Sequence, residues 1–131
     1  MRRTIKLNNE ILKQMKIIYY QKNCQYIDWM GFRITQENKP SYHHIKKAET
    51  LRKENKNDDA TIENGAYLGK KSHELLHRIE VIDKDLYNAW NHLFLLINKQ
   101  KKYPSDDIWN LIYDLKEKSI MLIEDDNKKI L

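Results

Sequence analysis

The sequence contains one cysteine, Cys24, among its 131 residues. A lone thiol cannot form an intrachain disulfide, and it cannot supply the four ligands of a structural zinc site. These limits exclude a disulfide-stapled secreted framework. We therefore expect the chain to fold by hydrophobic packing and to be cytoplasmic, in a reducing compartment.

The sequence also has no long apolar run. The basic residues 1–4 lead into a segment that polar side chains interrupt, namely those of Lys6, Asn8, Asn9 and Glu10. A membrane-spanning helix needs about 20 mostly apolar residues, so we expect neither a signal peptide nor a membrane span. No internal repeat or low-complexity tract divides the chain, and its length fits a single domain over residues 1–131.

The spacing of apolar residues predicts most of the helices. It favours helices over residues 8–22, 70–80 and 83–101. The sequence PSDD at residues 104–107 is typical of the start of a last helix. Pro40 marks the entry to an extended segment that carries two adjacent histidines.

Four of the five histidines fall into two pairs, His43 with His44 and His73 with His77. Adjacent residues on a strand point to opposite faces, whereas residues four apart on a helix share one face. Three imidazoles that converge from the strand and the helix would make a metal site with an open coordination position. The remaining strand histidine could act as a base. The pattern indicates a metal-dependent hydrolase.

The residues around these histidines follow a specific order. Residues 41–45 read SYHHI, residues 61–68 read TIENGAYL, and residues 72–77 read SHELLH. In this order they resemble the first strand, the asparagine-bearing loop and the closing helix of the HNH, or ββα-metal, nuclease family. The resemblance covers about a quarter of the chain and has four ordered parts, so it is more specific than a lone short motif.

The resemblance implies a role for each residue. His43, His73 and His77 would be the metal ligands, as in the all-histidine sites of colicin-type nucleases. His44 would be the general base, and Asn64 would hold the loop between the strands and help to orient His44. The cofactor would be one divalent ion. Nitrogen ligands favour Zn²⁺ or Ni²⁺ by affinity, whereas turnover could use Mg²⁺ or Mn²⁺.

The resemblance and the helices predicted from apolar spacing together imply the fold. We predict an α+β, mostly helical domain, with a small ββα-metal centre at about residues 40–80 between helical flanks at 1–39 and 81–131. Two features depart from the family pattern. The zinc knuckle of many members is absent, because its second cysteine pair would fall at Gly69 and Ser72. Residues 46–60 are expected to form a long charged loop, where relatives often have a short glycine-containing turn.

Positive charge is concentrated in the part of the chain that carries the histidines. The net charge is +5, while residues 104–131 hold more acidic than basic residues. A basic surface suits DNA, because neutralising phosphates releases counterions. Taken alone, the charges fit a solvated lysine-rich surface equally well. The predicted nucleic-acid contacts are Lys46, Lys47, Lys70, Lys71 and Arg78.

The predicted function is a metal-dependent DNA endonuclease, either a nickase or a double-strand nuclease, of phage or mobile-element character. The alternative is a catalytically inactive HNH-like module that binds DNA or a protein partner, such as a phage-encoded inhibitor of a host defence system. Loss of the zinc knuckle and the long charged loop favour the alternative. Retention of four histidines and Asn64 favours the enzyme, since an inactive module has no use for a free base beside a metal. A structural zinc protein is a third reading, which an open coordination position disfavours.

Overall fold

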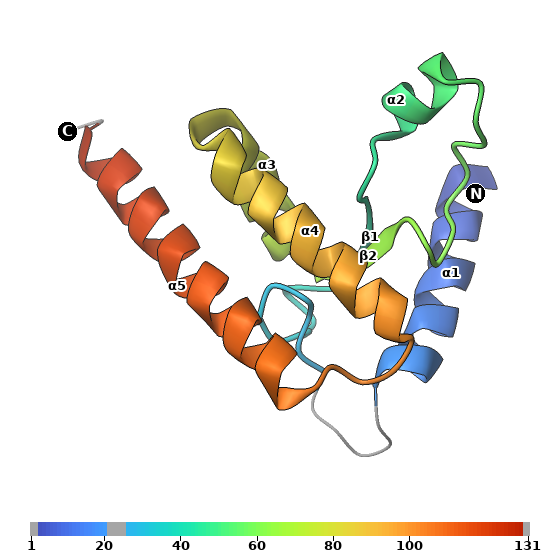
Figure 1. The fold of residues 1–131 in the computed structure, drawn as a ribbon, viewed down its shortest axis with the longest axis horizontal. Coiled ribbons are helices and arrows are strands. Elements are labelled where there is room, and N and C mark those ends of the chain that lie inside the picture. Colours follow the sequence, from blue (N-terminus) through green and yellow to red (C-terminus); the bar gives the residue numbers. More distant parts are fainter. Residues whose placement is uncertain (1–2, 21–25, 130–131) are drawn as a thin grey trace.

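The sheet of this protein has two antiparallel strands and is flanked by helices, which confirms the predicted α+β, mostly helical class. The computed structural model describes residues 3–20 and 26–129. Figure 1 shows the order of the elements along the chain. They are α1 (Arg3–Tyr19), β1 (Pro40–His44), α2 (Ala48–Lys53), β2 (Gly65–Gly69), α3 (Lys70–Ile82), α4 (Lys84–Gln100) and α5 (Asp106–Lys129).

The predicted helices are present, with shifted ends. The helices α3, α4 and α5 begin within one residue of the expected positions or at them. The first helix begins five residues earlier than expected and ends at Tyr19, and the predicted end at Lys22 lies outside the described residues. Within the described part of the chain, none of the helices combines the length and the apolar character that a membrane span requires.

The prediction of an unbroken loop over residues 46–60 was wrong, because α2 lies within it. Its sequence AETLRK consists largely of good helix formers. Glu49 and Lys53, four residues apart, form an ion pair of 3.2 Å along its surface. No residue of this short helix is buried. Core packing therefore does not account for α2, whereas its composition and its surface ion pair favour a helix.

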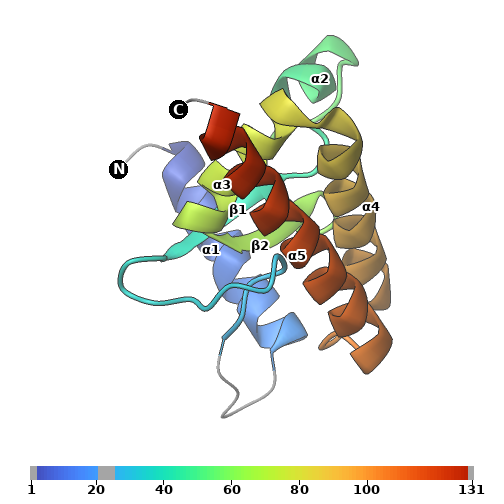
Figure 2. The same ribbon diagram turned by 90° about the vertical axis from the view of Figure 1, so that its left-hand side faces the viewer.

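The sheet lies between α1 on one side and the α3–α4 pair on the other (Figures 1 and 2). In its register Pro40 pairs with Gly69 and His44 with Gly65. The helix α1 packs against both strands, α3 against both strands, and α4 against β2. The helix α5 packs on the outer side of α3 and α4. The ββα unit thus has helical support on both faces.

Aromatic side chains form much of the core. Trp29, Trp90 and Phe94 are fully buried, and the rings of Trp90 and Phe94 stack with centroids 5.8 Å apart. Buried aromatic side chains each remove about 150–250 Å² from water, so they dominate the energetics of such a core. The indole nitrogen of Trp90 donates to the Ser119 hydroxyl at 2.9 Å, which joins α4 to α5.

The helix that carries His73 and His77 begins immediately after β2, without a loop. The first backbone N–H groups of a helix have no partner within it. Here the amide of Gly69 donates to the Asp28 carboxylate at 2.8 Å, and the amide of Lys71 donates to the Asn38 side chain at 2.8 Å. A Cβ at Gly69 would collide with Asn38, so this position requires glycine. Residues upstream of β1 therefore fix where α3 starts.

Asp28 has no exposed surface, and its carboxylate accepts three backbone hydrogen bonds. We expect Asp28→Asn to lower the free energy of unfolding by about 1–3 kcal/mol, because the new amide group would face a backbone N–H without an acceptor. Urea unfolding followed by circular dichroism measures the change. Asp125→Asn, on the exposed surface of α5, is the matched control and should unfold as the wild type does. Equal stability of the two variants would contradict a structural role for Asp28.

Candidate metal centre

Three histidines from two elements meet at one place. His43 lies in β1, and His73 and His77 lie one turn apart on the same face of α3. One ring nitrogen of each lies within 4.8 Å of the other two. Nδ1 of His43 and Nε2 of His73 are 3.4 Å apart. Two nitrogens that bind one tetrahedral metal at roughly 2.0–2.1 Å lie roughly 3.3–3.4 Å apart, so this pair fits a shared metal ion.

The His43 ring is held from its far side by α4. Its Nε2 donates to the side-chain oxygen of Asn91 at 2.9 Å, which leaves Nδ1 with a free lone pair directed at His73. The side chain is only 2% exposed. Burial lowers the pKa of His43 to about 3, against an opposing effect of the Asn91 hydrogen bond. The ring is therefore neutral near pH 7, which is the form that binds a metal.

The other two histidines also have polar groups on the side away from the cluster. Nδ1 of His73 is 2.9 Å from the Ser41 hydroxyl, and Nδ1 of His77 is 3.7 Å from the Glu80 carboxylate. Burial lowers the pKa of His73 to about 4. Ligand histidines generally use their second nitrogen for such an outer contact, which fixes the ring orientation. The three histidines together could hold a metal ion.

His44 leaves the strand on the opposite side from His43. Its Nε2 donates to the backbone carbonyl of Asp58 at 3.0 Å, and its ring stands edge-on to Tyr42 with centroids 4.8 Å apart. A carbonyl oxygen can only accept, so the proton is on Nε2 and Nδ1 can accept one. Nη1 of Arg52 donates to the Asp58 carboxylate at 2.7 Å and so restrains the loop that carries this carbonyl. The charged segment that contains α2 therefore fixes the tautomer of His44.

Asn64 ties the two strands together just beyond His44. Its side-chain oxygen accepts from the amide of Lys46 at 2.8 Å, and its side-chain nitrogen donates to the Lys46 carbonyl at 2.9 Å. Its own carbonyl accepts from the amide of Ile45 at 2.8 Å. These three bonds hold the backbone that follows His44, in the manner expected of a residue that positions this loop.

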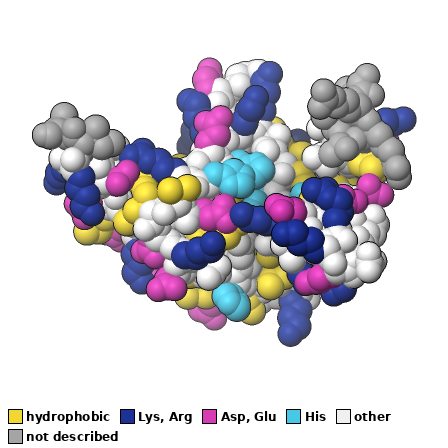
Figure 3. All heavy atoms as spheres, turned by 90° about the horizontal axis from the view of Figure 1, so that it is seen from above, with side chains coloured by type: hydrophobic (Ala, Val, Ile, Leu, Met, Phe, Trp, Pro, Cys, Tyr) yellow, Lys and Arg dark blue, Asp and Glu magenta, His cyan; other side chains and the backbone are white. Residues whose placement is uncertain are grey.

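His44 and the three clustered histidines line one cleft of about 260 Å³, whose wall also includes Tyr42, Lys47, Ala48, Glu80 and Tyr87. Figure 3 shows a central patch of histidine side chains with basic and acidic side chains around it, and a further histidine area apart from this patch. The fifth histidine, His92, is exposed on α4 and is not part of the cluster. The cleft thus combines a ligand set, a candidate base and access from solvent.

Two of the predicted nucleic-acid contacts, Lys46 and Lys47, lie beside the histidines, and both form ion pairs. Nζ of Lys47 is 2.6 Å from Glu80, and Nζ of Lys46 is 2.6 Å from Glu54. Both lysine side chains are about half exposed, at 43% and 51%. Part of the positive charge at the cleft is therefore already compensated within the chain.

The remaining predicted contacts differ in position. Arg78 donates to Asp126 and Asn127 of α5, so it joins two helices. Lys71 lines a separate hollow, outside the histidine cleft. Lys70 is exposed in the first turn of α3, three residues before His73 and on that side of the helix. The structure therefore brings only some of the five predicted DNA-contacting residues next to the histidines.

Comparisons of the chain with protein-family models, with curated proteins and with solved structures find no match. The likeness to HNH nucleases therefore rests on the residue order alone.

Four residues that contact the site histidines were not predicted from the sequence. For two of them the spacing along the strand or the helix could have indicated the contact. Ser41 lies two residues before His43 on the strand, and residues two apart share a face. Glu80 lies three residues after His77 on the helix, within contact range. The other two, Asn91 in α4 and Asp58 in the loop after α2, approach the histidines only through the tertiary fold.

We expect Asn91→Ala to weaken Zn²⁺ binding about 10–100-fold, because His43 loses the acceptor that orients its ring. Titration calorimetry measures the affinity, and a melting curve checks that the variant folds. Asn88→Ala, on the exposed surface of the same helix, is the matched control and should bind like the wild type. If a folded Asn91→Ala protein kept the wild-type affinity, Asn91 would have no part in the metal centre.

Proposed function

We propose that the protein is a metal-dependent DNA endonuclease with a one-metal HNH mechanism. One arrangement supports this function. One ring nitrogen each of His43, His73 and His77 lies within 4.8 Å of the other two. A fourth histidine, His44, lines the same cleft, with its Nε2 bonded to a backbone carbonyl and its Nδ1 able to accept a proton. A purely structural metal site needs four protein ligands and no base. Three ligands beside a base suit hydrolysis.

The proposed ligands are His43, His73 and His77. A divalent cation bound there would stabilise negative charge on the scissile phosphate as a Lewis acid. His44 would take a proton from the attacking water through Nδ1. The water oxygen forms the new bond to phosphorus, the bond to the 3′ oxygen breaks, and that oxygen takes a proton from solvent. Asn64 would act by holding the backbone that follows His44.

The donor set guides the choice of metal. Three imidazole nitrogens favour Zn²⁺ or Ni²⁺ by affinity, whereas Mg²⁺ and Mn²⁺ are available and exchange readily. Burial keeps His43 and His73 unprotonated well below neutral pH, so protons compete little for these two ligands. A panel of all four metals is therefore the appropriate test.

A catalytically inactive binding module is the second candidate, and the charge distribution favours it. Lys46, Lys47 and Arg78 are all paired with acidic side chains of the same chain. Compensated lysines attract a polyanion less strongly than free ones. In this reading the cluster would bind a metal without turnover.

The decisive measurement is cleavage of supercoiled plasmid DNA with Mg²⁺, Mn²⁺, Ni²⁺ or Zn²⁺. We expect cleavage by the wild type with at least one metal. His44→Ala should reduce the rate about 10²–10⁴-fold with nearly unchanged metal affinity, since a general base contributes about that factor. His77→Ala should lose metal affinity as well as activity, because it removes a ligand.

His92→Ala is the matched control for metal binding, since this exposed histidine is outside the cluster, and the variant should keep the wild-type metal affinity. Absence of cleavage with all four metals, or full activity of His44→Ala, would reject the enzyme. The binding module would then be the better description.

A further inference from the structure

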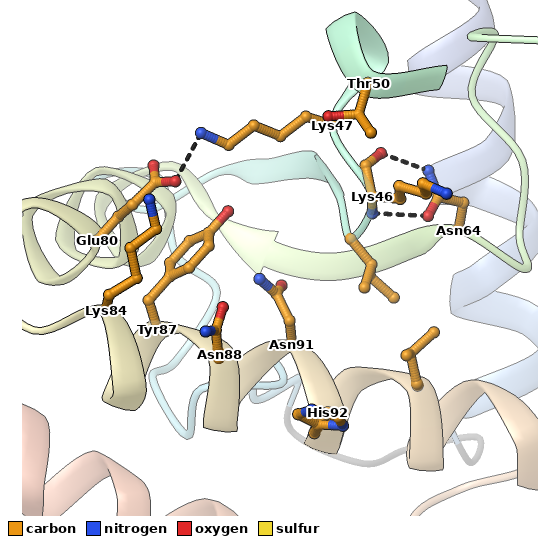
Figure 4. Close-up of a pocket in the computed structure, with 12 residues that line it drawn as sticks. Lys46, Lys47, Thr50, Asn64, Glu80, Lys84, Tyr87, Asn88, Asn91 and His92 are labelled. Carbon is orange, nitrogen blue, oxygen red and sulfur yellow. Dashed lines mark hydrogen bonds and ion pairs between the residues drawn. The ribbon is translucent and has the colours of Figure 1, made fainter. Parts of the chain in front are cut away.

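A hollow of about 660 Å³ adjoins the histidine cleft and lies between α2 and α4. Lys47, Glu80 and Tyr87 line both spaces. Figure 4 shows the side chains of Tyr87 and Asn91 rising from α4 into the hollow, and Lys47 reaching over it from the α2 side. A polymer bound at the histidines could therefore continue into this hollow.

The Tyr87 hydroxyl is the most informative group in this hollow. The side chain is 5% exposed, and its hydroxyl has no hydrogen-bond partner among the described residues. A buried hydroxyl without a partner destabilises the folded state. The ring also lies against His43, with centroids 6.5 Å apart. A ligand that accepts from this hydroxyl would satisfy it right beside the metal centre.

The neighbouring groups are also donors. The Asn91 oxygen is taken by His43, so its amide nitrogen is the atom left to the hollow. Lys84 is exposed, and among the described residues no carboxylate lies within ion-pair distance of it. The carboxylate that lines the hollow, that of Glu80, is already paired with Lys47. The hollow therefore offers hydrogen-bond donors and net positive charge.

We propose that this hollow binds a second phosphodiester group of the DNA strand, with Tyr87, Asn91 and Lys84 as its donors. The inference rests on the proposed endonuclease function, because the scissile phosphate would occupy the histidine cleft. The two non-bridging oxygens of a phosphodiester only accept hydrogen bonds, so they match a set of donors. A base edge presents donors as well as acceptors and matches less well. The second contact would direct the strand along α4.

The first experiment measures binding of a short fluorescein-labelled DNA duplex in EDTA, where cleavage does not interfere. Lys84→Gln should reduce the slope of log affinity against log salt concentration by about 0.9, the value for one lost phosphate contact. Lys84→Arg keeps the charge and should keep the slope. Lys102→Gln is the matched control, because this exposed lysine lies beyond the other end of α4.

The second experiment uses Tyr87→Phe, which removes the hydroxyl and keeps the ring. DNA affinity should fall roughly tenfold, as for a lost hydrogen bond to a charged group, and the salt slope should not change. The melting temperature should stay equal or rise, because the hydroxyl has no partner to lose. A lower melting temperature with wild-type affinity would show a structural role instead and overturn the proposal.

The failures of the two proposals are distinguishable. If Lys84→Gln and Tyr87→Phe bind DNA like the wild type, the phosphate subsite is wrong, whether or not plasmid is cleaved. Absence of DNA binding by the wild type at low salt also overturns it. If both variants lose affinity as expected while no metal supports cleavage, the subsite stands and the endonuclease function fails.

Discussion

The site depends on keeping one imidazole buried and uncharged. An exposed histidine with a pKa near 6.5 is partly protonated around neutral pH, and a protonated nitrogen cannot bind a metal. His43 avoids this because it is 2% exposed, which lowers its pKa to about 3. Burial creates a second requirement, since the Nε2 proton needs an acceptor. Asn91 supplies that acceptor, so α4 belongs to the site although it lies outside the ββα unit.

A second constraint sets the position of the other two ligands. The helix α3 can present His73 and His77 to His43 only if its first residue is fixed relative to β1. The Asp28 carboxylate and the Asn38 side chain provide this by accepting from the amides of Gly69 and Lys71. A buried carboxylate thus anchors the junction between β2 and α3 through hydrogen bonds.

The sequence was sufficient for the features that depend on local periodicity. The boundaries of α3 and α4 follow from apolar spacing, and the three convergent histidines follow from strand and helix geometry. The hydrogen-bond partners that support these histidines could not be predicted from periodicity. Asn91 is 48 residues from His43, and Asp58 is 14 residues from His44 in a segment taken for a loop. Such contacts depend on how helices and loops meet in the tertiary fold, which periodicity does not encode.

The ion pairs around the cleft bear on both proposed functions. Lys47 is 51% exposed, and solvent screens an ion pair at such a surface, so its bond to Glu80 holds it only weakly. In the proposed DNA complex, the Lys47 ammonium would use its remaining N–H donors for a phosphate while its bond to Glu80 persists. Glu80 would keep its contact with His77. If the protein binds DNA as proposed, the internal ion pairs would therefore lower the long-range attraction without blocking phosphate contact at short range.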